Sequence, residues 1–177
     1  MRIQFDARVL AKHVRDVADF PQEGVAFKDI TPLLTNPQAF SSAVDAIVVS
    51  FGRGTIDKVI GIEARGFILA TPVAYHMNAG FVPVRKAGKL PRRTLHETYD
   101  LEYGSETIEM HADALEINDR VLIVDDVLAT GGTAAAACAL VERAGAQVAG
   151  LAFLIELTAL NGAEKIADHD YTSLLQY

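Results

Sequence analysis

Residues 121–133, VLIVDDVLATGGT, contain the pattern that decides the fold. The four aliphatic residues at 121–124 form a continuous run that is typical of a central strand in a parallel sheet. Two carboxylates, Asp125 and Asp126, follow directly, and a turn of small residues then leads into an alanine-rich helix. Ligands of open parallel sheets bind beyond the carboxyl ends of the strands, so this turn is the first candidate for a functional site.

The rest of the chain alternates between helices and short apolar strands. Asp6 is a candidate cap for a helix, because the apolar residues that follow it recur at helical spacing up to Ala18. Asn36-Pro37 opens a second helix, which ends before Gly52. Strands are predicted over 58–62, 81–85, 107–112, 120–126 and 148–155, and further helices over about 67–78 and from the turn to near Gly145. This alternation predicts an α/β fold with a mostly parallel, doubly wound sheet and helices on both faces.

Composition indicates one globular domain of 177 residues with a net charge of −7. That charge argues against a general affinity for duplex DNA or for an anionic membrane. The single cysteine, Cys138, excludes an internal disulfide framework and is typical of a reducing compartment. We see no secretory signal and no apolar run near the ~20 residues of a membrane span. We therefore expect one cytoplasmic domain over 1–177, with no nucleic-acid and no membrane partner.

The turn after the central strand has the composition of a ribose-phosphate site. It offers small residues and hydroxyls, namely Ala129, Thr130, Gly131, Gly132 and Thr133. Backbone N–H groups and a helix N-terminus can converge there on a phosphate. Asp125 and Asp126 would repel phosphate but suit ribose hydroxyls or a bridging cation. A Walker loop and a Rossmann G-x-G-x-x-G fingerprint are both absent from the sequence.

Two segments depart from the regular alternation. Residues 20–34, FPQEGVAFKDITPLL, have no clean period and indicate an ordered, non-repetitive segment. Residues 85–104, RKAGKLPRRTLHETYDLEYG, are rich in Lys and Arg and poor in aliphatic residues. A connection of this length is more often functional or mobile than incidental, so we expect a loop.

With these motifs, the chain resembles the type I phosphoribosyltransferases, whose phosphoribosyl-pyrophosphate (PRPP) motif is similar to residues 121–133. The resemblance runs from about residue 20 to residue 177 through FPQEGVAFKDITPLL, IEARGF, RKAGKLP, YDLEYG, IELTAL and TSLLQY. The combination of the first segment with LEYG is specific for the family members that use adenine. The resemblance implies the type I phosphoribosyltransferase fold, with a small N-terminal hood at about 20–34 and a flexible catalytic loop at about 85–104.

The resemblance also implies an activity. The enzyme would be a glycosyltransferase of the pentosyltransferase class that transfers 5-phosphoribosyl from PRPP to adenine, giving AMP and pyrophosphate in purine salvage. Mg²⁺ is the implied cofactor, carried by PRPP, and a homodimer is implied. The five histidines show no metal-ligand spacing of their own. Charge separates as the ribose–pyrophosphate bond breaks, so such a site needs anion stabilisers and carboxylates.

The family pattern assigns roles to further residues. Glu102 in LEYG is the implied catalytic acid/base, hydrogen-bonded to the imidazole edge of adenine. Tyr99 and Tyr103 would close the loop and exclude water. The implied pyrophosphate ligands are Arg65, Arg85, Lys86 and Lys89, and the implied adenine contacts are Ala26, Phe27 and Leu157. An unusual peptide geometry is expected at Ala64–Arg65, and some of the basic residues would reach across the dimer interface.

Two alternatives stay open. A PRPP-sensing regulator would keep the ligand site without catalysis, but the purine-operon repressors that resemble this family carry an added DNA-binding domain, for which we see no segment. A xanthine or orotate phosphoribosyltransferase is the second alternative, because Lys28 would suit the exocyclic carbonyls of an oxopurine. Arg92 and Arg93 are interpreted as solvated loop residues, and Cys138 as a small core residue.

Overall fold

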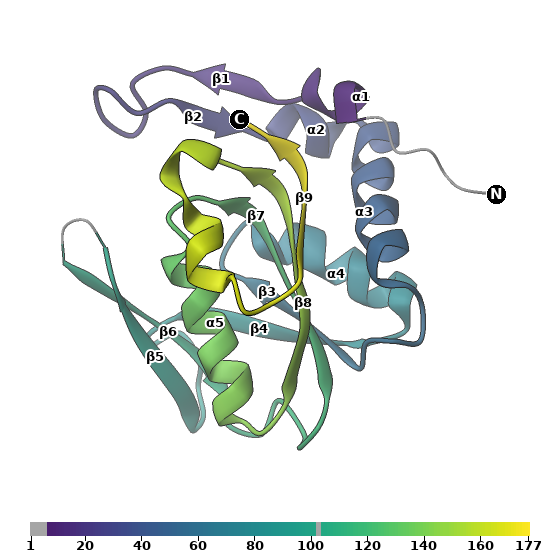
Figure 1. The fold of residues 1–177 in the computed structure, drawn as a ribbon, viewed down its shortest axis with the longest axis vertical. Helices are drawn as coiled ribbons and strands as arrows, with labels where there is room; N and C mark the ends of the chain where they lie inside the picture. The colour runs from purple at the N-terminus through teal and green to yellow at the C-terminus, as the bar shows by residue number, and fades with distance from the viewer. Residues whose placement is uncertain (1–6, 102–103) are drawn as a thin grey trace. The chain divides into compact units, whose positions relative to one another are not determined.

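A computed structural model describes residues 7–101 and 104–177, which divide into two compact units between Ala46 and Ile47 (Figure 1). The first unit contains α1 (Ala7–Ala11), β1 (Arg15–Val17), β2 (Phe27–Asp29), α2 (Thr31–Thr35) and most of α3 (Pro37–Phe51). The second unit contains β3 (Lys58–Ile62), α4 (Gly66–Met77), β4 (Gly80–Lys86), β5 (Thr94–Asp100), β6 (Ser105–His111), β7 (Arg120–Leu128), α5 (Gly132–Arg143), β8 (Gln147–Glu156), the 3₁₀ helices η1 (Thr158–Leu160) and η2 (Gly162–Ile166), and β9 (Tyr171–Gln176). The single domain over 1–177 stays a prediction.

In the first unit, β1 and β2 form a two-stranded antiparallel sheet. Lys28 Nζ lies 2.5 Å from Asp16 Oδ1 across this sheet. The predicted helix up to Ala18 is therefore wrong beyond α1, because pairing with β2 outweighs a helical spacing of apolar residues. The predicted helix after Asn36 is confirmed as α3, and the Asn36 Oδ1 accepts a hydrogen bond from the backbone N–H of Ala39 at 2.9 Å.

The second unit is built on a seven-stranded sheet in the order β5-β6-β4-β3-β7-β8-β9. The strands from β4 to β9 in this order are parallel, and the β5–β6 hairpin adds to them in antiparallel fashion. The chain leaves β3 through α4 toward one edge and leaves β7 through α5 toward the other. Because parallel crossovers are right-handed, α4 and α5 lie on opposite faces of the sheet, as Figure 1 shows. The predicted doubly wound α/β fold is confirmed.

The strand order reverses between β3 and β7, which are direct neighbours. Residues 121–124 of β7 are fully buried, as the continuous aliphatic run predicts. The turns at residues 63–65 and 129–131 follow these two strands at the same edge of the sheet. In doubly wound sheets this reversal opens a crevice at the carboxyl ends of the strands, so the fold places both turns where a ligand binds.

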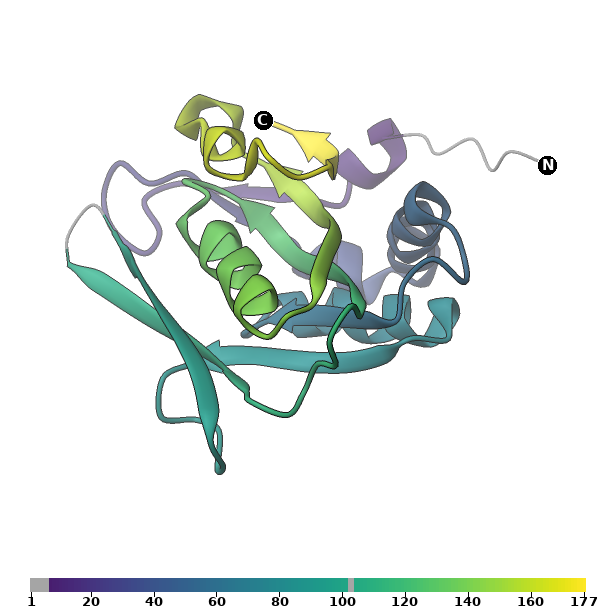
Figure 2. The ribbon, with the colours of Figure 1, turned by 60° about the horizontal axis from the view of Figure 1, so that its bottom comes forward.

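The first strand of the β5–β6 hairpin lies within the segment 85–104 that we predicted as a loop. Its register runs from Thr94 opposite His111 to Asp100 opposite Ser105, and Figure 2 shows it extending away from the body of the sheet. The loop prediction is wrong for Thr94–Asp100 because this strand is paired on one side only and needs few aliphatic residues. Arg143 of α5 holds it in place, since its Nη1 donates to the His96 carbonyl oxygen and to Glu97 Oε2, both at 2.7 Å.

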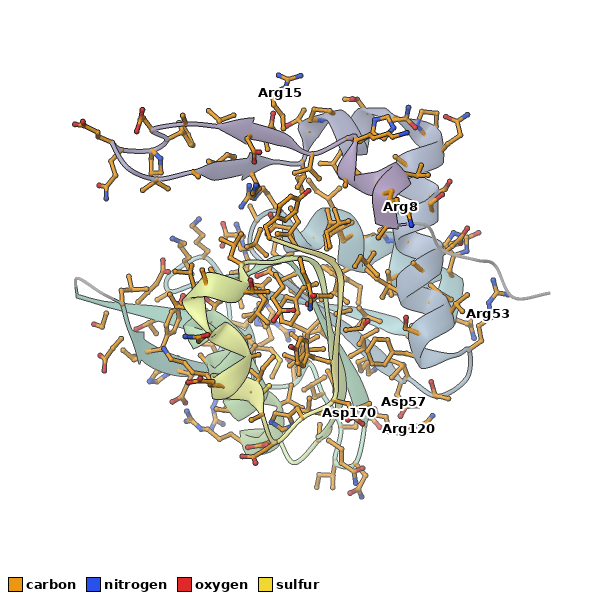
Figure 3. The ribbon with its side chains drawn as sticks, turned by 45° about the horizontal axis from the view of Figure 1, so that its top comes forward. Arg8, Arg15, Arg53, Asp57, Arg120 and Asp170 are labelled. Carbon is orange, nitrogen blue, oxygen red and sulfur yellow. The ribbon has the colours of Figure 1, made fainter. Side chains whose placement is uncertain are left out.

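An ion pair joins the starts of β3 and β7, at the sheet edge opposite these turns (Figure 3). Arg120 donates to Asp57 Oδ2 through Nε at 3.0 Å and through its backbone N–H at 2.8 Å. These hydrogen bonds lower the pKa of Asp57 to about 2. The pair therefore fixes the register of the two strands on which the crevice depends. No helix within the two described ranges is long and apolar enough to cross a membrane.

Candidate active site

The turns after β3 and β7 meet across the point where the strand order reverses. Arg65 Nε lies 2.8 Å from Asp126 Oδ2, and Asp126 is buried. Gly66, the first residue of α4, approaches β7 so closely that a Cβ at this position would lie 2.7 Å from Asp125 Oδ1. The two turns can meet only because Gly66 lacks a side chain. A cis peptide bond joins Glu63 to Ala64, one residue before the bond at which we expected unusual geometry.

Asp125 and Asp126 are adjacent carboxyl groups that interact directly. Asp125 Oδ1 accepts a hydrogen bond from the backbone N–H of Asp126 at 2.9 Å. Burial raises the pKa of Asp125 well above its ordinary value, and the negative charge of Asp126 adds to the effect. Burial also raises the pKa of Asp126, against the opposing charge of Arg65. Hydroxyl groups that donate to these buried oxygens would relieve this unfavourable electrostatic environment.

The turn before α5 has the tight backbone that its small residues predict. Gly131 is left-handed, with φ of 77°. A Cβ at Gly131 would lie 2.2 Å from the Gly162 carbonyl oxygen, and a Cβ at Gly162 would lie 2.2 Å from the Ala129 carbonyl oxygen. A cavity of about 70 Å³ lies against residues 127–134, and in the described part of the chain no side chain caps α5. Its first N–H groups can therefore bind an anion.

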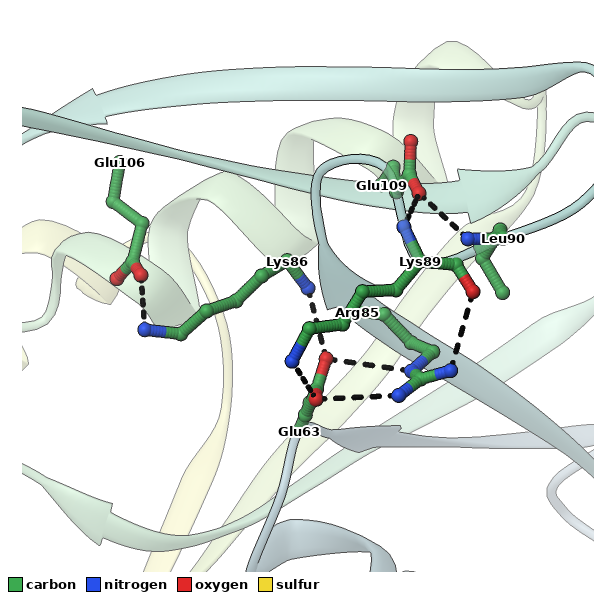
Figure 4. Close-up of polar contacts among 7 residues, drawn as sticks. All are labelled: Glu63, Arg85, Lys86, Lys89, Leu90, Glu106 and Glu109. Carbon is green, nitrogen blue, oxygen red and sulfur yellow. Dashed lines mark hydrogen bonds and ion pairs between the residues drawn. The ribbon is translucent and has the colours of Figure 1, made fainter.

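Basic side chains gather around Glu63 (Figure 4). Arg85 Nε donates to Glu63 Oε2 and Arg85 Nη2 donates to Glu63 Oε1, both at 3.3 Å. Lys89 Nζ lies 2.5 Å from Glu63 Oε1. The backbone N–H of Lys86 donates to Oε2 at 3.1 Å. Burial acts to raise the pKa of Glu63, but the hydrogen bonds from Lys89, Arg85 and Lys86 outweigh it and lower the pKa to about 2. Glu63 is therefore an ionised anchor for these cations.

A second carboxylate fixes the turn that carries Lys89. Glu109 is buried, and its Oε1 accepts the backbone N–H groups of Lys89 and Leu90, each at 3.0 Å. Its other oxygen, Oε2, accepts from the Thr94 hydroxyl at 3.2 Å. This network sets the direction in which Lys89 points and joins β6 to the start of β5.

A chain of polar contacts runs from the basic side chains around Glu63 to α5. Lys86 Nζ forms an ion pair with Glu106 Oε1, and Glu106 Oε2 accepts from the Tyr99 hydroxyl at 2.9 Å. The Thr133 hydroxyl donates to the Tyr99 hydroxyl oxygen at 2.8 Å. The hydrogen bond from Lys86 is the largest cause of the lowered pKa of Glu106, and burial together with the nearby Glu106 raises the pKa of Tyr99 to about 12.

Four of the seven predicted phosphate and ribose ligands, namely Ala129, Thr130, Gly131 and Gly132, line the smaller cavity of about 70 Å³. The other three border a cavity of about 260 Å³, together with three of the four predicted pyrophosphate ligands. Its lining includes Arg65, Arg85, Lys86, Tyr99, Asp125, Asp126 and Thr133. Lys89 joins this group through its contact with Glu63. Among residues 7–101 and 104–177, no three His, Cys, Asp or Glu side chains gather as a metal site. The cavity therefore combines cations, buried carboxylates and hydroxyl groups, a set that suits a phosphorylated sugar.

The predicted adenine and loop residues have a different outcome. Ala26 and Phe27 belong to the first unit, where the Phe27 ring packs edge-on against Phe20 with centroids 5.0 Å apart. Leu157 follows β8 in the second unit. A joint role of these three residues in binding adenine stays a prediction. Two further predicted residues, Glu102 and Tyr103, lie outside the described residues.

Three features of the site were not predicted from the sequence. Glu63 belongs to the IEARGF segment of the resemblance, but the role of its carboxylate as an anchor for cations was not predicted. Glu106 lies opposite Tyr99 in the β5–β6 hairpin. This pairing could not be read from the sequence, because Tyr99 was predicted to lie in a loop. Gly162 lies far in sequence from the turn at residues 129–131, which we call the phosphate turn, and no local pattern links the two.

Comparison with known proteins identifies the family. Residues 33–175 match the phosphoribosyl transferase domain family. The adenine phosphoribosyltransferase of Acidothermus cellulolyticus is 59% identical over 168 residues, which cover 95% of this chain and 95% of that protein. The chain belongs to the adenine phosphoribosyltransferase family. Its type I phosphoribosyltransferase fold is thereby confirmed.

Solved structures of the adenine phosphoribosyltransferase family agree with the fold. The enzyme of Rhodothermus marinus aligns with a TM-score of 0.93 at 55% identity, covering 97% of this chain and 98% of the other. The Saccharomyces cerevisiae enzyme, complexed with an imino-altritol bisphosphate and adenine, aligns with a TM-score of 0.90 at 39% identity. That alignment covers 96% of this chain and 98% of the yeast chain.

The close contact between Gly162 and the phosphate turn can be tested by substitution. Gly162→Ala would force the Ala129 carbonyl away, because the new Cβ has no room. We expect a loss of about 1–3 kcal/mol in unfolding free energy, together with weaker binding of ribose 5-phosphate, measured by denaturant unfolding and calorimetry. Gly80→Ala is the matched control, since its Cβ would meet mainly the flexible Lys58 side chain. Equal effects of the two substitutions would contradict the role of this contact.

Proposed function

We propose that this chain transfers the 5-phosphoribosyl group of PRPP to adenine, with release of pyrophosphate and formation of AMP. The observation that carries the proposal is one cavity, at the reversal of strand order, whose lining combines the cations Arg65, Arg85 and Lys86 with the carboxyl groups of Asp125 and Asp126. Membership of the adenine phosphoribosyltransferase family supplies the reaction. The chain is accordingly a pentosyltransferase of purine salvage.

The turn after β7 would bind the ribose 5-phosphate half of PRPP. The N–H groups of residues 129–133 would hold the 5′-phosphate at the start of α5, with the hydroxyls of Thr130 and Thr133 as further donors. Asp125 and Asp126 would accept hydrogen bonds from the ribose hydroxyls. Their negative charge would also stabilise the positive charge that develops on the sugar as the bond to pyrophosphate breaks.

The basic cluster would bind the pyrophosphate half of the substrate. Arg65, Arg85, Lys86 and Lys89 would counter the negative charge that grows on the leaving group. We propose that Mg²⁺ arrives on the oxygens of PRPP, because the carboxylates that contact this cluster, Asp126, Glu63 and Glu106, are already paired with its cations. When bound, the cation would supply further neutralisation of the leaving group.

The remaining groups would bind adenine and close the site. Phe27 would stack on the base, the backbone of Ala26 would bind its edge, and Leu157 would form the opposite apolar wall. The Saccharomyces cerevisiae relative was crystallised with adenine, which supports this choice of base. Glu102 would hydrogen-bond the imidazole edge, while Tyr99 and Tyr103 would exclude water during the reaction.

Two other functions have weaker support. A PRPP-sensing regulator would bind the same pyrophosphate group, but it would not need the catalytic glutamate implied at Glu102, which the sequence retains. An oxopurine-specific enzyme would use Lys28, whose ammonium group already contacts Asp16 within its own sheet. A cytoplasmic location, without nucleic-acid or membrane partners, stays a prediction from composition.

A panel of bases tests the function directly. The purified chain would be incubated with PRPP, Mg²⁺ and, separately, adenine, hypoxanthine, guanine, xanthine and orotate, and nucleotide formation would be followed by chromatography. We expect AMP from adenine alone, and loss of product when a chelator removes Mg²⁺. PRPP binding without product from any base would favour the regulator, and product from xanthine or orotate would favour the oxopurine or pyrimidine alternatives.

The role of Glu102 can be tested separately. Glu102→Gln removes the carboxylate but keeps the size of the side chain, and we expect kcat to fall by about 10²–10⁴-fold, the usual contribution of a general acid or base. Calorimetry should give a PRPP affinity close to that of the unmodified chain. Glu97→Gln, at a glutamate of β5 that is paired with Arg143, is the matched control. A kcat unchanged by Glu102→Gln would remove this residue from the mechanism.

We also propose that the chain forms a homodimer through the outer face of α4. Ile68 and Tyr75, seven residues apart on one helical face, are 42% and 82% exposed, and Phe81 of β4 is 37% exposed. Sedimentation should give twice the chain mass of 19.1 kDa. Tyr75→Lys should shift the protein toward the monomer, whereas Ile117→Lys, at another exposed apolar position, should not. A monomeric unmodified chain would contradict the proposal.

A further inference from the structure

Every cation of the proposed pyrophosphate site contacts a carboxylate of the chain itself. The pairs are Arg65 with Asp126, Arg85 and Lys89 with Glu63, and Lys86 with Glu106. A pyrophosphate group that enters the cavity must share these cations with the carboxylates or displace them. The strength of each internal pair therefore affects the affinity of the site for pyrophosphate.

The two glutamates of the cluster differ in how firmly they are held. Glu63 accepts hydrogen bonds from Arg85, from Lys89 and from the backbone of Lys86, and only 10% of its side chain is exposed. Glu106 accepts from two side chains, Lys86 and Tyr99, and 26% of its side chain is exposed. Its partner Lys86 is 55% exposed. The Lys86–Glu106 pair is thus the one that a ligand can open most readily.

Glu106 also connects the pyrophosphate side of the cavity to the phosphate turn. Through the Tyr99 hydroxyl it reaches the hydroxyl of Thr133, the second residue of α5. The Tyr99 ring lies against Gly132, where a Cβ would be 2.9 Å from the ring. One carboxylate therefore contacts Lys86 directly and Thr133 indirectly, and both are groups that PRPP would need.

We propose that Glu106 is an internal competitor for pyrophosphate. Without ligand, its carboxylate neutralises Lys86 and orients Tyr99; when pyrophosphate binds, Lys86 exchanges Glu106 for the ligand, and the exchange reverses as the product leaves. Glu106 is then a positioning residue that weakens the binding of pyrophosphate and favours its release. This inference rests on the proposed function, because it requires pyrophosphate to be a product.

Calorimetric titration with magnesium pyrophosphate tests the proposal. Glu106→Gln removes the charge but keeps an oxygen that can accept from the Tyr99 hydroxyl, so the hairpin should stay folded. We expect the dissociation constant to fall by about two- to fivefold, the range of a partly exposed ion pair. Inhibition of AMP formation by pyrophosphate should strengthen by the same factor. Glu97→Gln, which loosens the hairpin at Arg143 instead, should leave the pyrophosphate affinity unchanged.

A double-mutant cycle separates the pair from a general effect of charge. In a Lys86→Met background, Glu106→Gln should no longer tighten pyrophosphate binding, because the contact is already lost. Unchanged or weaker binding by Glu106→Gln alone would overturn the proposal, and so would equal tightening in the Lys86→Met background or in Glu97→Gln. AMP formation by the unmodified chain reports separately on the proposed function. If AMP forms and the cycle shows no coupling, only the role of Glu106 fails.

Discussion

The ion pair between Arg65 and Asp126 spans the point where the strand order of the sheet reverses, and the rest of the site is arranged around it. The pair requires β3 and β7 to be neighbours, and it requires a glycine at position 66 so that α4 can begin against β7. It also places a cation of one turn beside the buried carboxylates of the other. The pyrophosphate and ribose halves of one substrate can therefore be bound on the two sides of a single contact.

The electrostatic arrangement of the cavity follows from this constraint. Buried carboxyl groups with raised pKa values lie on the β7 side, whereas Glu63, with a pKa of about 2, anchors cations on the β3 and β4 side. Because Asp125 and Asp126 lie together at β7 while Glu63 gathers Arg85 and Lys89 beside β3 and β4, the site has the charges that the proposed reaction needs for the sugar and for the leaving group. Such preorganised charge is usually the largest contribution to catalysis.

The sequence alone predicts the parts of this protein whose residues are adjacent along the chain. The strand and turn at 121–133 were predicted because burial and tight geometry are both visible in the residue types. The strands at Arg15–Val17 and Thr94–Asp100 were not, because each depends on pairing with a partner strand that outweighs local spacing. For the same reason Glu106, which contacts Lys86 and Tyr99 on two different strands, was not named from the sequence, whereas Asp125, which borders the cavity, was.

The β5–β6 hairpin differs from the other elements that border the cavity in how it is held. The turns after β3 and β7 continue into helices packed on the sheet, so their geometry is set by the core. The hairpin adds to the sheet through a short pairing with β4 and rests on α5 through Arg143. Because Glu106 and Tyr99 belong to this outer element, a shift of the hairpin would change the pairing of Lys86 and, through Tyr99, the contact with Thr133 at the start of α5. In the proposed reaction, the hairpin would therefore link the release of pyrophosphate to the binding of the sugar phosphate.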